Sequence, residues 1–191
     1  MNPSLKEIAQ SIKVFFCDSD GVLFPNTILM GAPYKAKHRS FYDGLGILFL
    51  RELGIRIVFI TNEKGESAAA LRETVEKLNG LPSSKPQKAD GWEPIVMYEG
   101  RNGAKKLETA QEFLAEQGLT FADAAYMGDD LIDAPLLRAV ALPAAPAQAE
   151  EAIRGICKFV APREGGAGAI RDFANLVVAA RGRDPFTLPT Q

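Results

Sequence analysis

The chain has 191 residues, of which 47% are hydrophobic and 24% are charged, the proportions of an ordinary globular domain with a sizeable core. Its net charge of −2 excludes the strongly basic surface with which proteins bind nucleic acids or anionic membranes. A single histidine and two cysteines without a CxxC pair argue against a zinc site. No apolar run is long enough to span a bilayer, and the N-terminus has no signal-peptide pattern, so we expect a cytoplasmic protein.

Short β-branched and aromatic runs alternate along the chain with stretches of helical periodicity. The predicted strands are residues 12–17, 56–60, 95–98, 123–127 and 157–161. The predicted helices are residues 44–54, 65–79, 103–118, 130–139, 147–155 and 167–181. This alternation predicts an α/β fold, a doubly wound parallel sheet with helices on both faces, in a single domain over residues 1–181.

Two segments interrupt the alternation, and a third without periodicity ends the chain. Residues 26–42 contain two strand-like runs around a Gly-Ala-Pro turn and predict a β-hairpin insertion, with no large cap domain. Residues 79–94 are rich in Pro, Gly, Ser and Lys and predict a long loop, of the kind that is usually functional or mobile. Residues 182–191 are expected to form a partly disordered tail.

Polar residues follow four of the predicted elements, in the phrases "DSDG", "ITN", "GAKKL" and "GDDLID". The carboxyl ends of parallel strands meet at one edge of a doubly wound sheet, so we expect these phrases to converge there. They contribute Asp18 and Asp20, Thr61 and Asn62, Lys105 and Lys106, and Asp129, Asp130 and Asp133.

The residue types at this edge predict a phosphoryl-transfer site. Paired carboxylates at the end of a buried strand are costly unless a cation neutralises them, and oxygen ligands suit Mg²⁺. With the metal bound, Asp18 could attack phosphorus, while Asp20 could protonate the leaving oxygen and later deprotonate water. Thr61 and a lysine would stabilise the charge on the transferred group, and Gly21 would turn backbone N–H groups towards the phosphate.

In this order the four motifs resemble those of the haloacid dehalogenase-like (HAD) phosphatase superfamily. From residue 12 to about residue 180 the chain resembles its 3-deoxy-manno-octulosonate 8-phosphate phosphatases and their sialic-acid-type relatives. The hairpin, "DGLGI" at 43–47 and "GGAGAIRDF" at 165–173 support this resemblance. The family implies a capless phosphatase that hydrolyses a small sugar-type phosphate in lipopolysaccharide or nonulosonate biosynthesis, with hairpins that associate in a homotetramer.

The resemblance also implies roles for individual residues. Lys106 matches the family lysine better than Lys105 does. The implied magnesium ligands are Asp18, the backbone carbonyl of Asp20, and Asp129. The supporting carboxylates are Asp130 and Asp133, and the substrate-binding residues are Gly21, Asn62 and Arg171. In the hairpin, apolar contacts between subunits are expected from Ile28, Leu29, Met30 and Phe41.

The chain departs from the family pattern at two positions. Glu63 and Tyr42 stand where relatives commonly carry arginines, which suggests a substrate with other polar groups, such as a neutral or amino sugar phosphate. Arg171 fits either a substrate contact or a helix-surface charge. The alternative functions are a catalytically weak binding or scaffold protein and a phospho-receiver domain. The first would be expected to lack one of the motif residues, and the second carries its acceptor aspartate on a middle strand.

Overall fold

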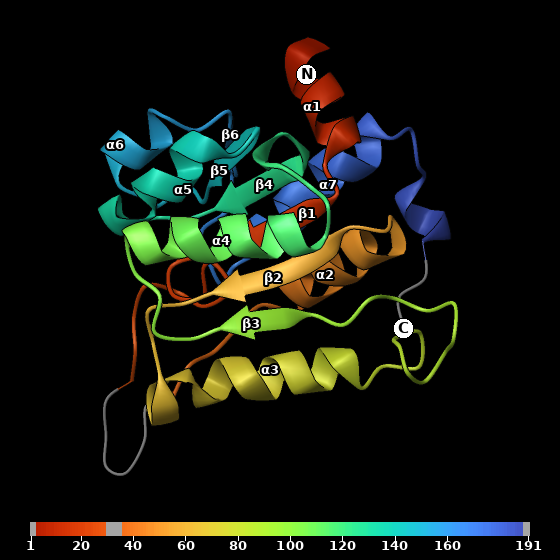
Figure 1. The fold of residues 1–191 in the computed structure, drawn as a ribbon, viewed down its shortest axis with the longest axis horizontal. Helices are drawn as coiled ribbons and strands as arrows, with labels where there is room; N and C mark the ends of the chain where they lie inside the picture. Colours follow the sequence, from red (N-terminus) through yellow and green to blue (C-terminus); the bar gives the residue numbers. More distant parts are fainter. Residues whose placement is uncertain (1–2, 30–35, 189–191) are drawn as a thin grey trace.

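A six-stranded parallel sheet forms the centre of the protein, seen in a computed structural model that describes residues 3–29 and 36–188 (Figure 1). The strand order is β3-β2-β1-β4-β5-β6. After β3 the chain therefore crosses to the other side of β1, where β4, β5 and β6 follow in order. The strands are β1 (Val14–Cys17), β2 (Arg56–Ile60), β3 (Val96–Tyr98), β4 (Ala124–Met127), β5 (Leu142–Ala145) and β6 (Phe159–Val160). The predicted doubly wound α/β fold is confirmed.

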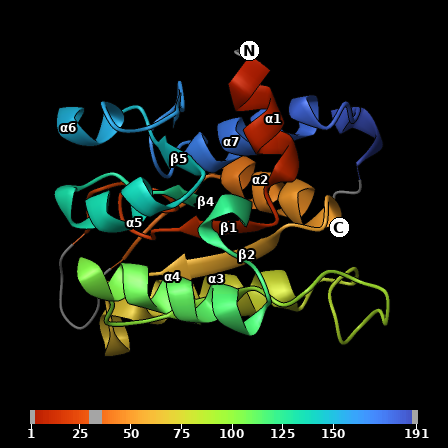
Figure 2. The same ribbon diagram turned by 45° about the horizontal axis from the view of Figure 1, so that its top comes forward.

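Helices cover both faces of the sheet. They are α1 (Pro3–Ser11), α2 (Phe41–Glu52), α3 (Ala69–Asn79), α4 (Ala104–Glu116), α5 (Ala134–Ala139), α6 (Glu151–Arg154) and α7 (Ala169–Ala180). Alternate residues of β1 enter different cores: Phe15 joins residues of α1, α2, α3 and α7, and Phe16 joins residues of α4, α5 and α6. Helices α2 and α7 lie side by side on the face of the sheet to which Phe15 points (Figure 2). Among the described residues, no helix combines the length and apolarity needed to cross a bilayer.

Three elements differ from the sequence-based expectation: β5 and α1 were not predicted, and α2 begins earlier than predicted. Strand β5 reads "LPAA", without β-branched residues, and becomes a strand through its burial between β4 and β6. Helix α1, also unpredicted, packs against α7. Helix α2 begins at Phe41 and so takes in the last two residues of the expected hairpin segment, because Ser40 caps it by accepting a hydrogen bond from the Tyr42 N–H.

The expected hairpin has an antiparallel base. The backbone groups of Leu29 and Ala36 exchange two hydrogen bonds, of 3.3 and 3.2 Å. Met30 lies outside the described residues. Because residues 18–40 are all that separates β1 from α2, this interval has no room for a large cap domain.

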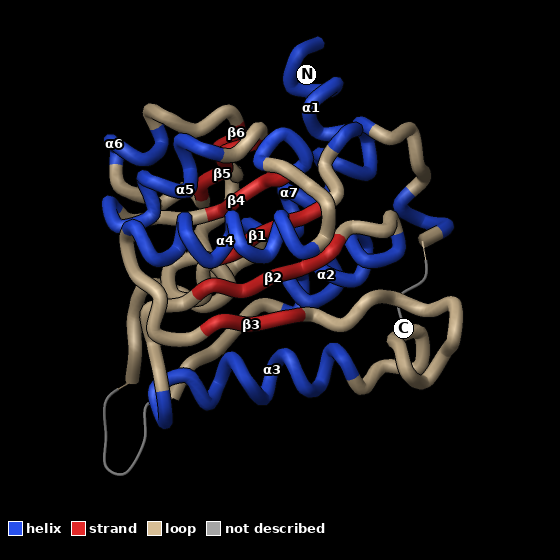
Figure 3. Tube along the Cα trace, viewed as in Figure 1, coloured by secondary structure: helices blue, strands red, loops and turns tan. Residues whose placement is uncertain are grey.

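The long loop between α3 and β3 makes a wide excursion at the edge of the molecule (Figure 3). Its Trp92 is buried and donates a hydrogen bond from Nε1 to Glu52 at the end of α2. The described part of the tail includes a 3-10 helix over Pro185–Thr187, and the side chain of Leu188 is buried in the hydrophobic core that contains Phe15. The expected partial disorder of the tail stays a prediction.

Candidate active site

The loops after β1, β2 and β4 bring the predicted motifs together at the carboxyl edge of the sheet. There they line a cavity of about 150 Å³, whose walls are formed by Asp18, Asp20, Asn26, Thr61, Asn62, Glu63, Asp129, Asp130 and Ile132. A larger cavity of about 490 Å³ lies beneath the loop after α3, at the other end of β2. None of the motif residues lines that larger cavity, so the smaller one is the candidate active site.

A buried lysine holds two of the aspartates. Lys106, at the start of α4, is fully buried, and its Nζ lies 2.8 Å from Asp18 Oδ2 and 2.6 Å from Asp133 Oδ1. Burial lowers the pKa of Lys106, but the two carboxylates more than offset it, so the net shift is upward. Lys105 instead lies on an outer surface with Arg101 and Glu108. Of the two lysines, Lys106 is therefore the one that lies beside the aspartates.

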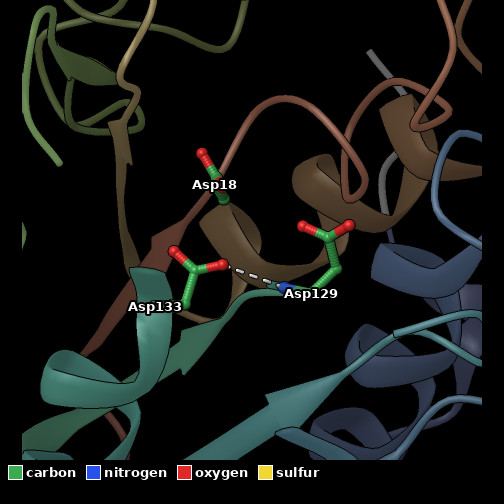
Figure 4. Close-up of side chains that lie close together, drawn as sticks. All are labelled: Asp18, Asp129 and Asp133. Atoms are coloured by element: carbon green, nitrogen blue, oxygen red, sulfur yellow. Dashed lines mark hydrogen bonds between the residues drawn. The ribbon is translucent and has the colours of Figure 1, made fainter. Parts of the chain in front are cut away.

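Asp133 uses both carboxylate oxygens to hold its neighbours. Oδ1 accepts hydrogen bonds from Lys106 and from the Tyr126 hydroxyl, at 2.6 and 2.5 Å. Oδ2 accepts the backbone N–H of Asp129 at 3.0 Å, the bond drawn in Figure 4, and that of Asp130 at 3.2 Å. Asp133 thus holds Lys106 and the loop after β4. Asp130 caps the following turn by accepting the Leu131 N–H.

Asp129 faces the cavity with its charge poorly compensated. Burial, together with the negative charges of Asp18, Asp133 and Asp130, raises the pKa of this carboxyl to about 8. Burial likewise raises the pKa of Asp18, against the opposing effect of Lys106. Oxygens of Asp18, Asp129 and Asp133 all lie within 4.8 Å of one another. A cation bound between the carboxylates would relieve this crowding.

The donor set fits a magnesium ion. Because Asp133 spends its oxygens on four hydrogen-bond donors, Asp18 and Asp129 are the carboxylates that remain for a metal. Gly21 allows Asp129 to approach the first loop, since a Cβ at this glycine would lie 1.9 Å from Asp129 Oδ2. Gly21 also has a φ of +81°, which other residues rarely adopt.

The hydroxyl of Thr61 sits at the end of β2, where it is buried beside Ser19. Its Oγ1 accepts the backbone N–H of Glu63 at 3.1 Å and lies 2.8 Å from Ser19 Oγ. Asn62 is exposed and lines the cavity. Sequence reasoning missed Ser19 because a serine between two aspartates carries no signal of its own. It also missed Tyr126, whose alternation on β4 indicates only a core position.

Arg171 does not join the cavity. Its guanidinium lies over the ring of Phe49 at 4.3 Å, and its Nε donates to Asn175 on the same helix. Its backbone N–H, with those of Gly168 and Ile170, donates to the buried carboxylate of Asp43. Within a single chain, the Arg171 side chain therefore lies along the surface of its own helix, which is the second of the two interpretations given above.

Comparison with known proteins first identifies the class. A solved structure described as a HAD superfamily (subfamily IIIA) hydrolase of Legionella pneumophila superposes with a TM-score of 0.79 at 27% identity, covering 94% of this chain and 88% of that one. The cobalt-bound deoxy-D-mannose-octulosonate 8-phosphate phosphatase of Haemophilus influenzae has a TM-score of 0.77 at 25% identity, covering 92% of both chains. No family model matches the sequence. Fold and site together define a capless HAD-superfamily phosphatase.

A curated relative then narrows the class to one family. The 3-deoxy-D-manno-octulosonate 8-phosphate phosphatase of Yersinia pestis is 30% identical over 174 residues, which cover 91% of this chain and 83% of that protein. The chain belongs to the 3-deoxy-D-manno-octulosonate 8-phosphate phosphatase family. The predicted resemblance and the predicted hydrolase class are confirmed.

Proposed function

We propose that the protein is a magnesium-dependent phosphomonoesterase that hydrolyses a small sugar-type phosphate through an aspartyl-phosphate. One observation carries this proposal: Asp18 lies at the cavity wall with a buried lysine 2.8 Å from its carboxylate and Asp129 beside it. Lysine and metal together would keep Asp18 ionised beside an anionic substrate.

The residues divide the reaction into two steps. An Asp18 oxygen forms a bond to phosphorus as the bond to the ester oxygen breaks, and Asp20 gives its proton to that oxygen, which leaves as an alcohol. Water then attacks phosphorus and gives a proton to Asp20. The bond between phosphorus and the Asp18 oxygen breaks, which releases orthophosphate and restores Asp18. Thr61 and Lys106 stabilise the negative charge of the transferred group, and Asn62 and the Gly21 turn bind its oxygens.

Asp18, the backbone carbonyl of Asp20, and Asp129 would hold the magnesium ion, while Asp130 and Asp133 support them. When bound, the metal lowers the charge repulsion between the substrate and the aspartates. The crowded carboxylates support this assignment, as does the divalent cobalt ion in the Haemophilus influenzae relative. Binding is tested by the rise of the thermal midpoint on addition of MgCl₂ and its reversal by EDTA.

The substrate class is a sugar-acid phosphate such as 3-deoxy-manno-octulosonate 8-phosphate, with neutral and amino sugar phosphates as the alternatives. Glu63 lines the cavity and favours the alternatives, since it adds negative charge. The guanidinium of Arg163 lies 5.2 Å from the centre of the Tyr42 ring. An arginine therefore lies close to the position at which relatives commonly carry one. The Arg163 guanidinium is paired with Asp172 and does not line the cavity, so the acidic sugar is supported by the named relatives and not by this arginine.

Phosphate release from a panel of sugar phosphates, with Mg²⁺ and with EDTA, tests the proposal. We expect turnover that needs the metal and falls by a factor on the order of 10³ or more in Asp18→Asn, since removal of a nucleophile abolishes the covalent route. The preferred panel member identifies the substrate class. If no member releases phosphate although Mg²⁺ binds, the protein is a scaffold.

We further propose a homotetramer joined through the hairpins in the cytoplasm. Large apolar side chains near the hairpin base support this assembly, because Leu29 is 73% exposed, Phe41 92% and Ile28 40%. Two free cysteines are compatible with a reducing compartment. Light scattering coupled to size-exclusion chromatography tests the assembly, and Leu29→Ser with Phe41→Ser should convert a tetramer to smaller species.

A further inference from the structure

The hairpin segment contributes a cation to the catalytic edge. Lys37 follows the paired base of the hairpin, and its Nζ lies 2.6 Å from Asp20 Oδ1. The Lys37 side chain is only 3% exposed, whereas that of Asp20 is 29% exposed and borders the cavity. The ammonium also lies 5.4 Å from the ring centroid of the buried Phe24.

This arrangement binds Lys37 to Asp20 rather than to solvent. A buried ammonium without a partner is strongly unfavourable, so the ion pair is retained as long as the lysine stays in its pocket. The other oxygen of Asp20, Oδ2, lies 3.1 Å from Ser19 Oγ. Both carboxylate oxygens are therefore held, one from the hairpin and one from the catalytic loop.

We propose that Lys37 is a positioning residue for Asp20. It holds the Asp20 carboxyl at the cavity wall, in the orientation from which its proton reaches the ester oxygen of the substrate. The hairpin thereby takes part in the reaction of its own subunit, in addition to any contact between subunits. This inference rests on the proposed acid–base role of Asp20 and adds the residue that orients it.

The test compares two esters whose leaving groups need different amounts of help. p-Nitrophenyl phosphate releases a weakly basic phenolate that leaves without a proton, whereas phenyl phosphate releases a more basic one that benefits from general acid catalysis. In Lys37→Met, which retains the length of the side chain, we expect kcat/KM for phenyl phosphate to fall by about tenfold or more and that for p-nitrophenyl phosphate by less than about threefold. Lys37→Arg should recover part of the loss.

A double-mutant cycle separates positioning from a general structural role. Asp20→Asn should show the same preference for the better leaving group, and adding Lys37→Met to it should change kcat/KM by less than about twofold, because the two residues act as one unit. Lys105→Met, which removes an exposed lysine outside the cavity, is the matched control. Thermal midpoints verify that each variant is folded.

The outcomes distinguish this inference from the function on which it rests. If the wild-type protein hydrolyses neither ester with Mg²⁺ present, the proposed function fails. If it hydrolyses both, but Lys37→Met lowers the two values equally or its effect adds fully to that of Asp20→Asn, Lys37 does not act through Asp20 and the inference is wrong.

Discussion

Replacing Gly21 by alanine tests the close approach of the first catalytic loop to Asp129. The added Cβ would lie 1.9 Å from Asp129 Oδ2 and 2.2 Å from its Cγ, so the carboxylate would have to move. The backbone at Gly21 also has a φ of +81°, where an alanine costs roughly 1–2 kcal/mol. Gly21→Ala therefore combines a backbone cost with displacement of a carboxylate that we propose binds the metal.

Gly54 provides a matched control, because its φ of +75° is nearly the same and a Cβ there would have no heavy atom within 4 Å. Gly54→Ala should lose only the free energy that it costs to place an alanine at a positive φ. This loss lowers the thermal midpoint by roughly 2–8 °C in a domain of this size. Its phosphatase activity should stay close to that of the wild type.

In Gly21→Ala we expect the same loss of stability, together with weaker magnesium binding and a fall in kcat/KM on the order of 100-fold, the effect of displacing a reacting group by about 1 Å. The assay is p-nitrophenyl phosphate hydrolysis as a function of MgCl₂ concentration, with thermal melts of both variants with and without the metal. If Gly21→Ala keeps the activity and the magnesium response of Gly54→Ala, contact between Gly21 and Asp129 is not needed for the site.

Two further predictions concern buried carboxylates. Asp133→Asn leaves Lys106 with one carboxylate partner and should lower the free energy of unfolding by about 3 kcal/mol, whereas Asp130→Asn, on an exposed turn, should cost less than about 1 kcal/mol; urea unfolding measures both. Burial raises the pKa of Asp43 to about 6, so the folded chain holds this proton more tightly than the unfolded chain does. The stability that this proton contributes is present at about pH 4 and is lost as the pH rises towards 6. Relative to wild type, Asp43→Asn should therefore gain stability over this interval, and parallel pH curves for the two proteins would contradict the assignment.

The sequence predicts the catalytic edge well because its signals are local. Each motif is a short apolar run that ends in a polar phrase, and parallel pairing of the strands then brings those ends together without any further information. Asp18, Thr61 and Asp129 all line the cavity as expected. Elements without such a signal were missed, and β5 is the clearest example, since its burial between two strands exists only once the sheet has formed.

Side chains that act through a partner could not be found in this way. Lys37 belongs to a basic stretch of the hairpin segment, where a solvated lysine is the ordinary expectation. Only the folded chain shows that it is buried against Asp20. In the opposite sense, Arg171 sits in a phrase typical of the family, yet its guanidinium lies over Phe49, outside the cavity.

The balance of charge explains why two aspartates can end the first strand. Asp18, Asp129 and Asp133 are buried, and the fully buried Lys106 compensates only one of their charges. Lys37 balances the charge of Asp20 while Asp20 is ionised, so two negative charges remain at the edge of the sheet before Asp20 takes up a proton. A divalent cation would balance them, and a phosphate dianion would then approach a neutral site instead of a repulsive one. In the proposed mechanism, the same carboxylates that would exclude the substrate in the absence of metal therefore become, with magnesium bound, its nucleophile and its anchor.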